Sequence, residues 1–123
     1  MTPEDELAGG PTPTTTQIWR VEHRELFEVL RRARRRRHGP ITISWVPGDP
    51  AEPPRVAYTI GRRVGTAVVR NRLRRRLRML IREAAPTLRP GAYLIGVAPS
   101  ATTWTYAQLE AHVHKALKEL DRS

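Results

Sequence analysis

Residues 61–84 read GRRVGTAVVRNRLRRRLRMLIREA, and this stretch decides the architecture. A helix turns by about 100° per residue, so five of the apolar side chains of this stretch fall within one arc of about 80°. The stretch therefore predicts a long helix that begins near Thr66 and ends before Pro86, with an apolar stripe that packs on the core. The stripe contains Val69, Leu73, Leu77, Leu80 and Ala84.

The same stretch carries a continuous positive charge. Between Arg62 and Arg82 there are nine arginines and no acidic residue. Neighbouring guanidinium groups on the outward face repel one another, and an array of phosphates relieves that repulsion. Asn71 adds a neutral amide that can bond a base edge or a 2′-hydroxyl. We interpret this face as a nucleic-acid surface, and the alternative is a solvated basic face.

The whole chain shares this charge bias. Its 123 residues include 22 Lys and Arg against 12 Asp and Glu, which gives a net charge of +10 and a pI of about 11.4. Twenty of the 22 basic residues are arginines, whose planar fork binds phosphate in two places and stacks on bases. There is no cysteine, which excludes disulfides, thiolate metal sites and a cysteine nucleophile.

The sequence shows no membrane or export signal. No apolar run approaches the roughly 18 residues that a membrane span needs. The N-terminus is acidic and lacks the basic start and apolar stretch of a signal peptide. We therefore expect a cytoplasmic protein that does not contact a membrane.

The rest of the chain alternates helix and strand. Residues 1–17 are rich in proline, glycine and threonine, so we expect a disordered tail followed by one domain over residues 18–123. Periodicity predicts, in chain order, a helix over 22–37, strands over 41–46 and 55–60, the basic helix, a strand over 92–98 and a helix over 105–120. The order α-β-β-α-β-α indicates an α+β sandwich, in which the first two strands pair antiparallel.

The segment Gly61–Arg78 resembles the signature of the bacterial ribonuclease P protein subunit. That signature has a basic pair, a glycine, an Ala-Val pair and Arg-Asn-Arg, here Arg62-Arg63, Gly65, Ala67-Val68 and Arg70-Asn71-Arg72. The resemblance extends over roughly residues 18 to 121. It implies a small α-β-β-β-α-β-α sandwich, ribosomal S5 domain 2-like, with a left-handed β-α-β crossover. A short additional strand near residues 37–39 would complete this order.

The resemblance also implies a function. The family removes the 5′ leader of precursor tRNA by hydrolysis, and an RNA subunit with Mg²⁺ carries out the reaction. The protein subunit binds that RNA and the leader, so we expect no bound cofactor, no obligate protein partner and no nuclease activity from the protein alone. The sequence agrees, because it has no acidic pair, metal-ligand cluster or nucleophile-base set that could hydrolyse a phosphodiester.

Two groups of residues match the contact positions of the family. The positions that imply binding to the RNA subunit are Arg62, Arg63, Arg70, Asn71, Arg72, Arg74, Arg75 and Arg78. The positions that imply leader binding lie in a groove between the first helix and the open sheet face, and they are Phe27, Leu30, Thr42, Ser44, Ala57 and Thr59. Many relatives have an aromatic residue at the position of Ser44, which cannot stack on a base.

Three other interpretations each explain part of the sequence. A ribosomal protein or assembly factor would have this size and charge but not the long ordered motif. A DNA-binding domain would need a helix and a tight turn before the arginine helix, where we expect a strand and a glycine-rich turn. A membrane-surface helix would need aromatic residues on its apolar side. Co-purification of ribonuclease P RNA would separate the resemblance from all three.

Overall fold

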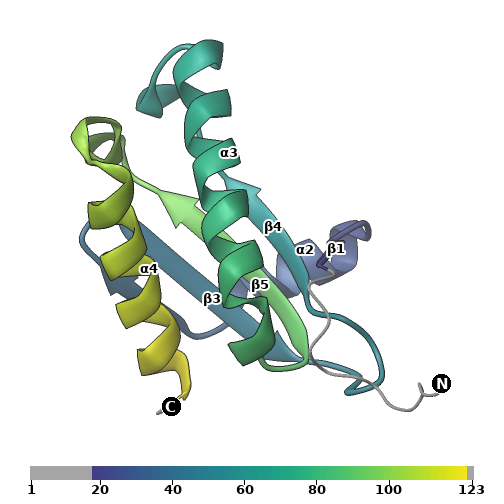
Figure 1. Ribbon diagram of the computed structural model, residues 1–123. Coiled ribbons are helices and arrows are strands. Elements are labelled where there is room, and N and C mark those ends of the chain that lie inside the picture. The colour runs from purple at the N-terminus through teal and green to yellow at the C-terminus, as the bar shows by residue number, and fades with distance from the viewer. Residues whose placement is uncertain (1–17, 122–123) are drawn as a thin grey trace, which may run out of the picture.

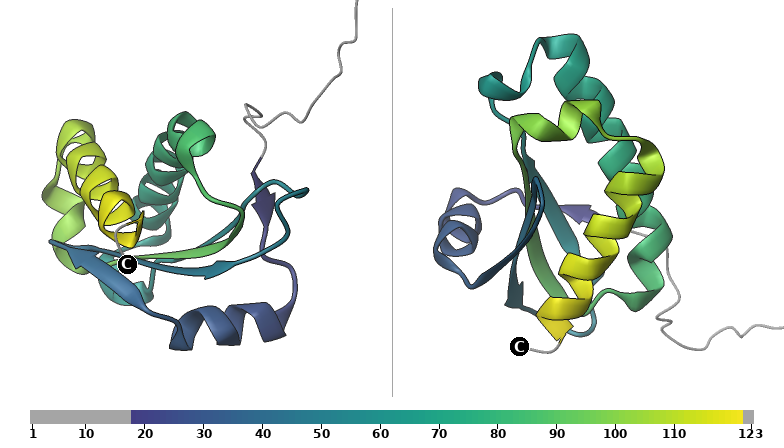
Figure 2. Two further views of the ribbon diagram at one scale, coloured as in Figure 1. Left: turned by 90° about the horizontal axis from the view of Figure 1, so that it is seen from below. Right: turned by 90° about the vertical axis from the view of Figure 1, so that its left-hand side faces the viewer.

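The computed structural model describes residues 18–121, so the predicted tail over residues 1–17 lies outside the described residues. A five-stranded sheet has α3 and α4 on one face and α2 on the other (Figures 1 and 2). The helices and strands are β1 (Trp19–Arg20), α2 (Arg24–Arg32), β2 (Arg35–His38), β3 (Ile41–Pro47), β4 (Arg55–Thr59), α3 (Ala67–Ala84), β5 (Gly91–Val97) and α4 (Tyr106–Asp121). Three short 3₁₀ helices join them: η1 (Arg62–Val64), η2 (Ala85–Thr87) and η3 (Pro99–Thr103).

Strand β5 is the centre of the sheet, whose order is β1-β4-β5-β3-β2. It runs antiparallel to β3 and parallel to β4. Its residues from Ala92 to Ile95 are all buried, which is typical of a strand covered on both faces. The predicted antiparallel pairing of residues 41–46 with 55–60 is therefore wrong. Strand β5 lies between those two strands in the sheet. Its continuous apolar run fits this central position, where both of its faces are covered by helices.

Helix α3 connects the parallel neighbours β4 and β5. Seen from the side of α3 with both strands pointing upward, β5 lies to the left of β4, so the crossover is left-handed (Figure 1). About 98% of such crossovers have the opposite hand. The handedness that the family resemblance implies is thus confirmed, and the α+β architecture with it. The connection also brings the end of β4, η1 and the start of α3 together at one end of the sheet.

The main core fills the space between the sheet and the two helices α3 and α4. Leu73, Leu77 and Leu80 of the predicted stripe are at most 2% exposed, and Ile81 joins them. Val69 at the start of the stripe is only half-buried. The last helix begins with a capping box, since Thr105 and Gln108 exchange two hydrogen bonds of 2.8 and 3.1 Å.

Helix α2 is shorter than the sequence predicts, because it ends at Arg32 instead of near Arg37. Residues Arg35–His38 form strand β2, which pairs antiparallel with β3 at the edge of the sheet. A run of basic residues has no apolar period, so only the backbone pairing with β3 reveals the strand. Gly39 turns the chain between the two strands with φ of +56°, where an added Cβ would lie 2.6 Å from the Trp104 ring. Strand β2 is the additional strand that the resemblance requires.

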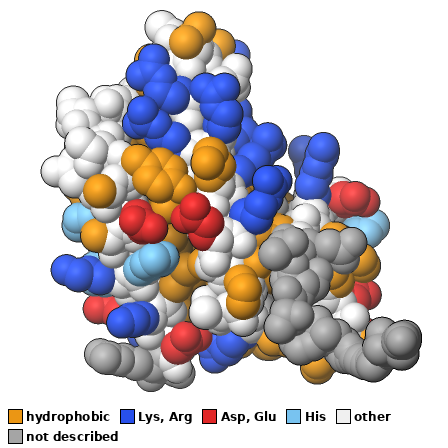
Figure 3. Space-filling view, viewed as in Figure 1, with side chains coloured by type: hydrophobic (Ala, Val, Ile, Leu, Met, Phe, Trp, Pro, Cys, Tyr) orange, Lys and Arg blue, Asp and Glu red, His pale blue; other side chains and the backbone are white. Residues whose placement is uncertain are grey.

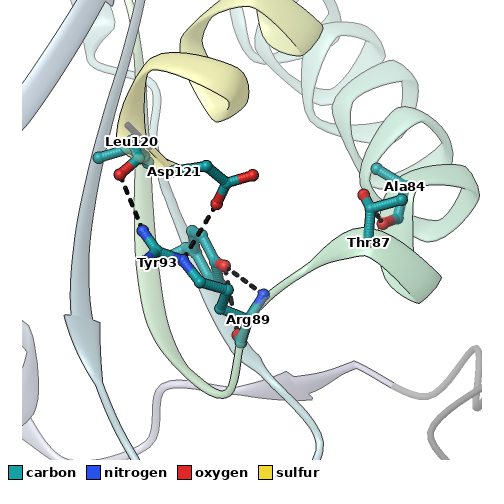
Figure 4. Close-up of polar contacts among 6 residues, drawn as sticks. All are labelled: Ala84, Thr87, Arg89, Tyr93, Leu120 and Asp121. Carbon is teal, nitrogen blue, oxygen red and sulfur yellow. Dashed lines mark hydrogen bonds and ion pairs between the residues drawn. The ribbon is translucent and has the colours of Figure 1, made fainter. Parts of the chain in front are cut away.

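Arg89 shows how an arginine with a structural role is held in this fold. Its guanidinium contacts Asp121 Oδ1 at 3.0 Å and donates to the carbonyl of Leu120 at 2.8 Å (Figure 4). The same group lies 3.9 Å from the centre of the Trp45 ring. Its backbone N–H donates to the Tyr93 hydroxyl at 2.9 Å, so this residue ties the end of α4 to β5.

Truncation of the α3 stripe tests this packing. Leu77 is fully buried, so Leu77→Ala is expected to lower the free energy of unfolding by about 2–5 kcal/mol through lost transfer energy and an unfilled cavity. Met79→Ala, on the same helix at a side chain that is 49% exposed, is the control and is expected to cost far less. Urea denaturation followed by circular dichroism measures both. Equal losses for the two variants would contradict the assignment of the buried face.

Candidate nucleic-acid interface

The start of α3 is built so that η1 and the helix present their arginines in a defined register. The Thr66 hydroxyl accepts a hydrogen bond from the Val69 N–H at 3.3 Å and caps the helix. Gly65 has φ of +155°, and an added Cβ would lie 3.1 Å from the Val69 side chain. This turn joins the exposed pair Arg62 and Arg63 to the helix that follows.

The α3 face that points away from the core is dense in exposed arginines. Of the eight residues predicted to contact an RNA subunit, six are exposed: Arg62, Arg63, Asn71, Arg72, Arg75 and Arg78. Figure 3 shows Lys and Arg side chains gathered over the first turns of α3 and continuing down one side of it. The burial of the leucines on the opposite side keeps this face turned to solvent.

Two of the eight residues are half-buried and make local hydrogen bonds. Arg70 Nε donates to the Gly65 carbonyl at 3.2 Å, which braces the turn before the helix. Arg74 Nη1 donates to Asn71 Oδ1 at 3.0 Å, so the Asn71 amide nitrogen keeps its two donors for a ligand.

Within residues 18–121 this face lacks carboxylate partners. None of the ion pairs among residues 18–121 includes an arginine of η1 or α3. Arginines elsewhere do pair, for example Arg55 with Glu52 at 3.6 Å and Arg31 with Glu28 at 3.8 Å. The arginines of α3 therefore repel one another in the folded protein, and a polyanion would relieve that repulsion.

A second candidate surface is a groove of about 650 Å³ between α2 and the opposite face of the sheet. Four of the six residues predicted to bind a leader line it: Phe27 from α2, Thr42 and Ser44 from β3, and Thr59 from β4. Gly96 of β5 and Gly61 also line it. Its floor is therefore made mainly of small side chains, next to one aromatic ring.

The other two predicted groove residues do not line it. Leu30 is fully buried beneath α2, in a small cluster with Ala92 and Leu94. The helical period turns Leu30 toward the sheet and leaves Phe27 one turn earlier at the groove wall. Ala57 is half-buried and packs against the same cluster. Both residues support the groove from below, which corrects the sequence-based placement.

Sequence reasoning missed three arginines of the groove. Arg31 of α2 and both Arg35 and Arg37 of β2 line it. Strand alternation turns Arg35 and Arg37 toward the groove, while His38 turns to the other face, where its Nε2 lies 3.1 Å from Glu119 Oε1. The error followed from extending the first helix through these residues. The usual sequence signal of a strand is an alternation of apolar and polar side chains. A run of four basic residues has no such alternation, so only the pairing with β3 identifies the strand.

The two surfaces lie on opposite faces of the sheet and meet at one end of it. Gly61 lines the groove, and the next residue, Arg62, begins η1 and leads into α3. Residues 18–121 contain no group of three or more His, Asp or Glu side chains placed to hold a metal ion. None of the helices in that range has the length and apolarity to cross a membrane.

Comparisons with known proteins place these features in a family context. A family model described as ribonuclease P matches residues 17–121. The ribonuclease P protein component of a Synechococcus strain is 36% identical over 108 residues, which cover 83% of this chain and 81% of the relative. That of Thermobifida fusca is 36% identical over 112 residues, 84% of this chain and 76% of the relative.

Solved structures with the same fold have more distant sequences. A mutant of the Staphylococcus aureus ribonuclease P protein superposes with a TM-score of 0.77 at 14% identity, covering 84% of this chain and 88% of that one. The protein from Thermotoga maritima superposes with a TM-score of 0.71 at 16% identity, covering 81% and 96%. At these identities the superposition supports the fold alone.

The charge on α3 can be tested with any structured RNA. Arg72→Ala with Arg75→Ala removes two exposed cations and is expected to weaken RNA binding. The plot of the logarithm of the association constant against the logarithm of the salt concentration is expected to become less steep, by roughly two in slope. Lys115→Ala with Lys118→Ala removes the same charge from the exposed side of α4 and is the control. Fluorescence anisotropy over a salt series measures both slopes. Identical slopes for the two variants would show that the RNA responds to net charge and not to the α3 face.

Proposed function

The chain belongs to the ribonuclease P protein family, and from this we propose that it binds the catalytic RNA subunit through η1 and α3 and the 5′ leader of precursor tRNA through the groove. In this proposal it acts in the cytoplasm and promotes the endonucleolytic removal of the leader, which leaves the mature 5′ end. The observation that carries the proposal is the run of nine arginines without an acidic residue between Arg62 and Arg82, held outward by the buried leucines.

The proposed division of labour leaves the hydrolysis to the RNA subunit and its Mg²⁺. A folded RNA concentrates phosphates, and their mutual repulsion must be screened before the RNA and a tRNA substrate can approach. The cations of α3 would supply part of that screening at fixed positions. The six exposed residues of the predicted set contribute five guanidinium groups and the Asn71 amide, which suits contacts to both phosphates and 2′-hydroxyls.

The proposed leader site uses two kinds of contact. Phe27 offers one ring on which a base can stack, and the small residues of the sheet leave room for a single strand beside it. Arg31, Arg35 and Arg37 stand along one wall, where they can bind leader phosphates. With Ser44 in place of a second ring, phosphate contacts carry more of this binding than stacking does.

Reconstitution tests the proposed activity. The protein alone is expected to leave precursor tRNA uncut, and the protein with ribonuclease P RNA is expected to accelerate cleavage most at low Mg²⁺, where the RNA alone lacks screening cations. The measurement is the rate of release of the 5′ leader over a Mg²⁺ series, with the RNA alone as the control. A rate that the protein does not change at any Mg²⁺ concentration would contradict the proposal.

Paired variants test the groove. Arg35→Ala with Arg37→Ala is expected to weaken binding of precursor tRNA with a leader of several nucleotides by about tenfold or more, because two phosphate contacts are lost. Affinity for mature tRNA, which has no leader, is expected to stay the same. The matched control is Arg32→Ala with Arg34→Ala, since both side chains are exposed and neither lines the groove. An equal loss for both ligands, or for both variants, would refute a leader site at these arginines.

A further inference from the structure

A cationic hollow of about 490 Å³ lies on the α3 side of the sheet, between β1, β4 and one flank of α3. Arg74, Arg78 and Arg82 line it from the helix, and they are four residues apart, so they follow one another at intervals of about 6 Å along that flank. Arg20 lines it from β1 and is in register with Val56, whose side chain belongs to the core beneath α3. Four arginines from two elements therefore surround one hollow.

The hollow has no anionic partner within the described part of the chain. No Asp or Glu lines it, and none of its four arginines takes part in an ion pair among residues 18–121. Burial raises the pKa of Tyr58 to about 12, and the positive charges of Arg78 and Arg82 oppose that rise. Both guanidinium groups therefore lie near the Tyr58 hydroxyl and not near a carboxylate. Like charges held this close together attract any anion that can reach them.

The described part of the chain begins at the wall of this hollow. Ile18 is its first residue, lines the hollow and packs against the main core. The 17 residues before it include three acidic residues in a row, Glu4, Asp5 and Glu6, and no Lys, Arg or His. We call Glu4–Glu6 the acidic segment. Its charge is thus opposite to that of the hollow, and the chain that carries it enters the fold beside the hollow.

Length and spacing both fit the acidic segment to the flank of α3. Residues 7–17 join it to Ile18, and an extended chain of that length spans up to about 40 Å. The three arginines of α3 occupy only about 12 Å of the helix axis. In an extended chain, side chains two residues apart lie about 7 Å apart on one side, close to the arginine interval. Glu4 and Glu6 can therefore each meet an arginine.

We propose that the acidic segment docks on the arginines of this hollow and competes there with RNA. Charge complementarity favours the docking, and the entry of the chain at Ile18 favours the hollow over the groove. The groove lies on the other face of the sheet, and its Arg31 already contacts Glu28. The docking itself does not depend on the proposed function, whereas the competition rests on that function and deepens it.

A tethered segment competes at every protein concentration. Because the segment and the hollow belong to one chain, the effective concentration of the segment is on the order of millimolar. A short RNA that contacts few arginines must displace it to gain those contacts. A large folded RNA also contacts exposed α3 arginines outside the hollow, such as Arg72 and Arg75, and loses a smaller share of its affinity. The acidic segment thus selects large folded RNA over short single strands.

A spin label tests the docking without RNA. The chain has no cysteine, so Ala8→Cys gives a single site for a nitroxide beside the acidic segment. At low salt the label is expected to broaden the backbone amide signals of residues 74–82 of α3 more than those of β2. The control carries the same label with Glu4→Gln, Asp5→Asn and Glu6→Gln, and it is expected to lose at least half of that broadening. High salt is expected to have the same effect on the labelled chain, because it screens exposed charges.

Fluorescence anisotropy tests the competition. The unlabelled chain with the three neutral substitutions is expected to bind hexauridine about fivefold more tightly than the wild type at low salt, and ribonuclease P RNA within about twofold of it. Glu22→Gln with Glu25→Gln and Glu110→Gln raises the net charge equally at residues that do not line the hollow. This control is expected to bind hexauridine within about twofold of the wild type. Circular dichroism verifies that all variants are folded.

The outcomes separate this inference from the proposed function. If neutralising the acidic segment leaves the broadening unchanged, the segment does not dock. If the label broadens β2 as strongly as α3, the hollow is not the docking surface. If the neutralised chain binds hexauridine no more tightly than the net-charge control does, the segment does not compete with RNA. Each of these results overturns the inference alone, whereas the proposed function fails if the wild type does not bind ribonuclease P RNA.

Discussion

Leu73, Leu77 and Leu80 are buried against the sheet, and their burial sets the rotation of α3 about its own axis. The order of residues along the helix fixes which of its sides is cationic, and this burial decides that the cationic side points to solvent. The core contact therefore holds the mutually repelling arginines together on the outer side of the sandwich. The short connection through η1 places the start of that helix at the end of β4, so the register of α3 and this connection together define the main basic surface.

The sheet separates two kinds of site. On one face, α3 presents charge in a rigid helical array. On the other face, α2 covers only part of the sheet and leaves a groove over small side chains. Both depend on β5, whose central position gives each face an apolar layer on which its helices pack. The two faces of the sheet thus carry two separate surfaces, an open groove and a cationic helix.

The arginines of this protein fall into two groups according to what their side chains contact. Arg89 and Arg55 contact carboxylates, carbonyls and indole rings, and they join elements that are distant in sequence. Within residues 18–121 the arginines of η1 and α3 have no carboxylate partner, whereas those of the groove wall contact carbonyls or, for Arg31, an exposed glutamate. A residue of one type therefore serves both stability and recognition, and its contacts decide which. This division explains why a high arginine content alone predicts a polyanionic partner but not the position of the site.

The sequence by itself determined α3, its buried stripe and its cationic face, because helical period is a property of one continuous segment. It also located Phe27 and the small β3 residues of the groove, since alternation sorts the two faces of a strand. Only the tertiary structure decided that β5 lies between β3 and β4, because strand order depends on pairing between distant segments. It likewise decided that Arg35–His38 form a strand and that Leu30 is buried, since backbone pairing and packing, not local composition, orient those side chains.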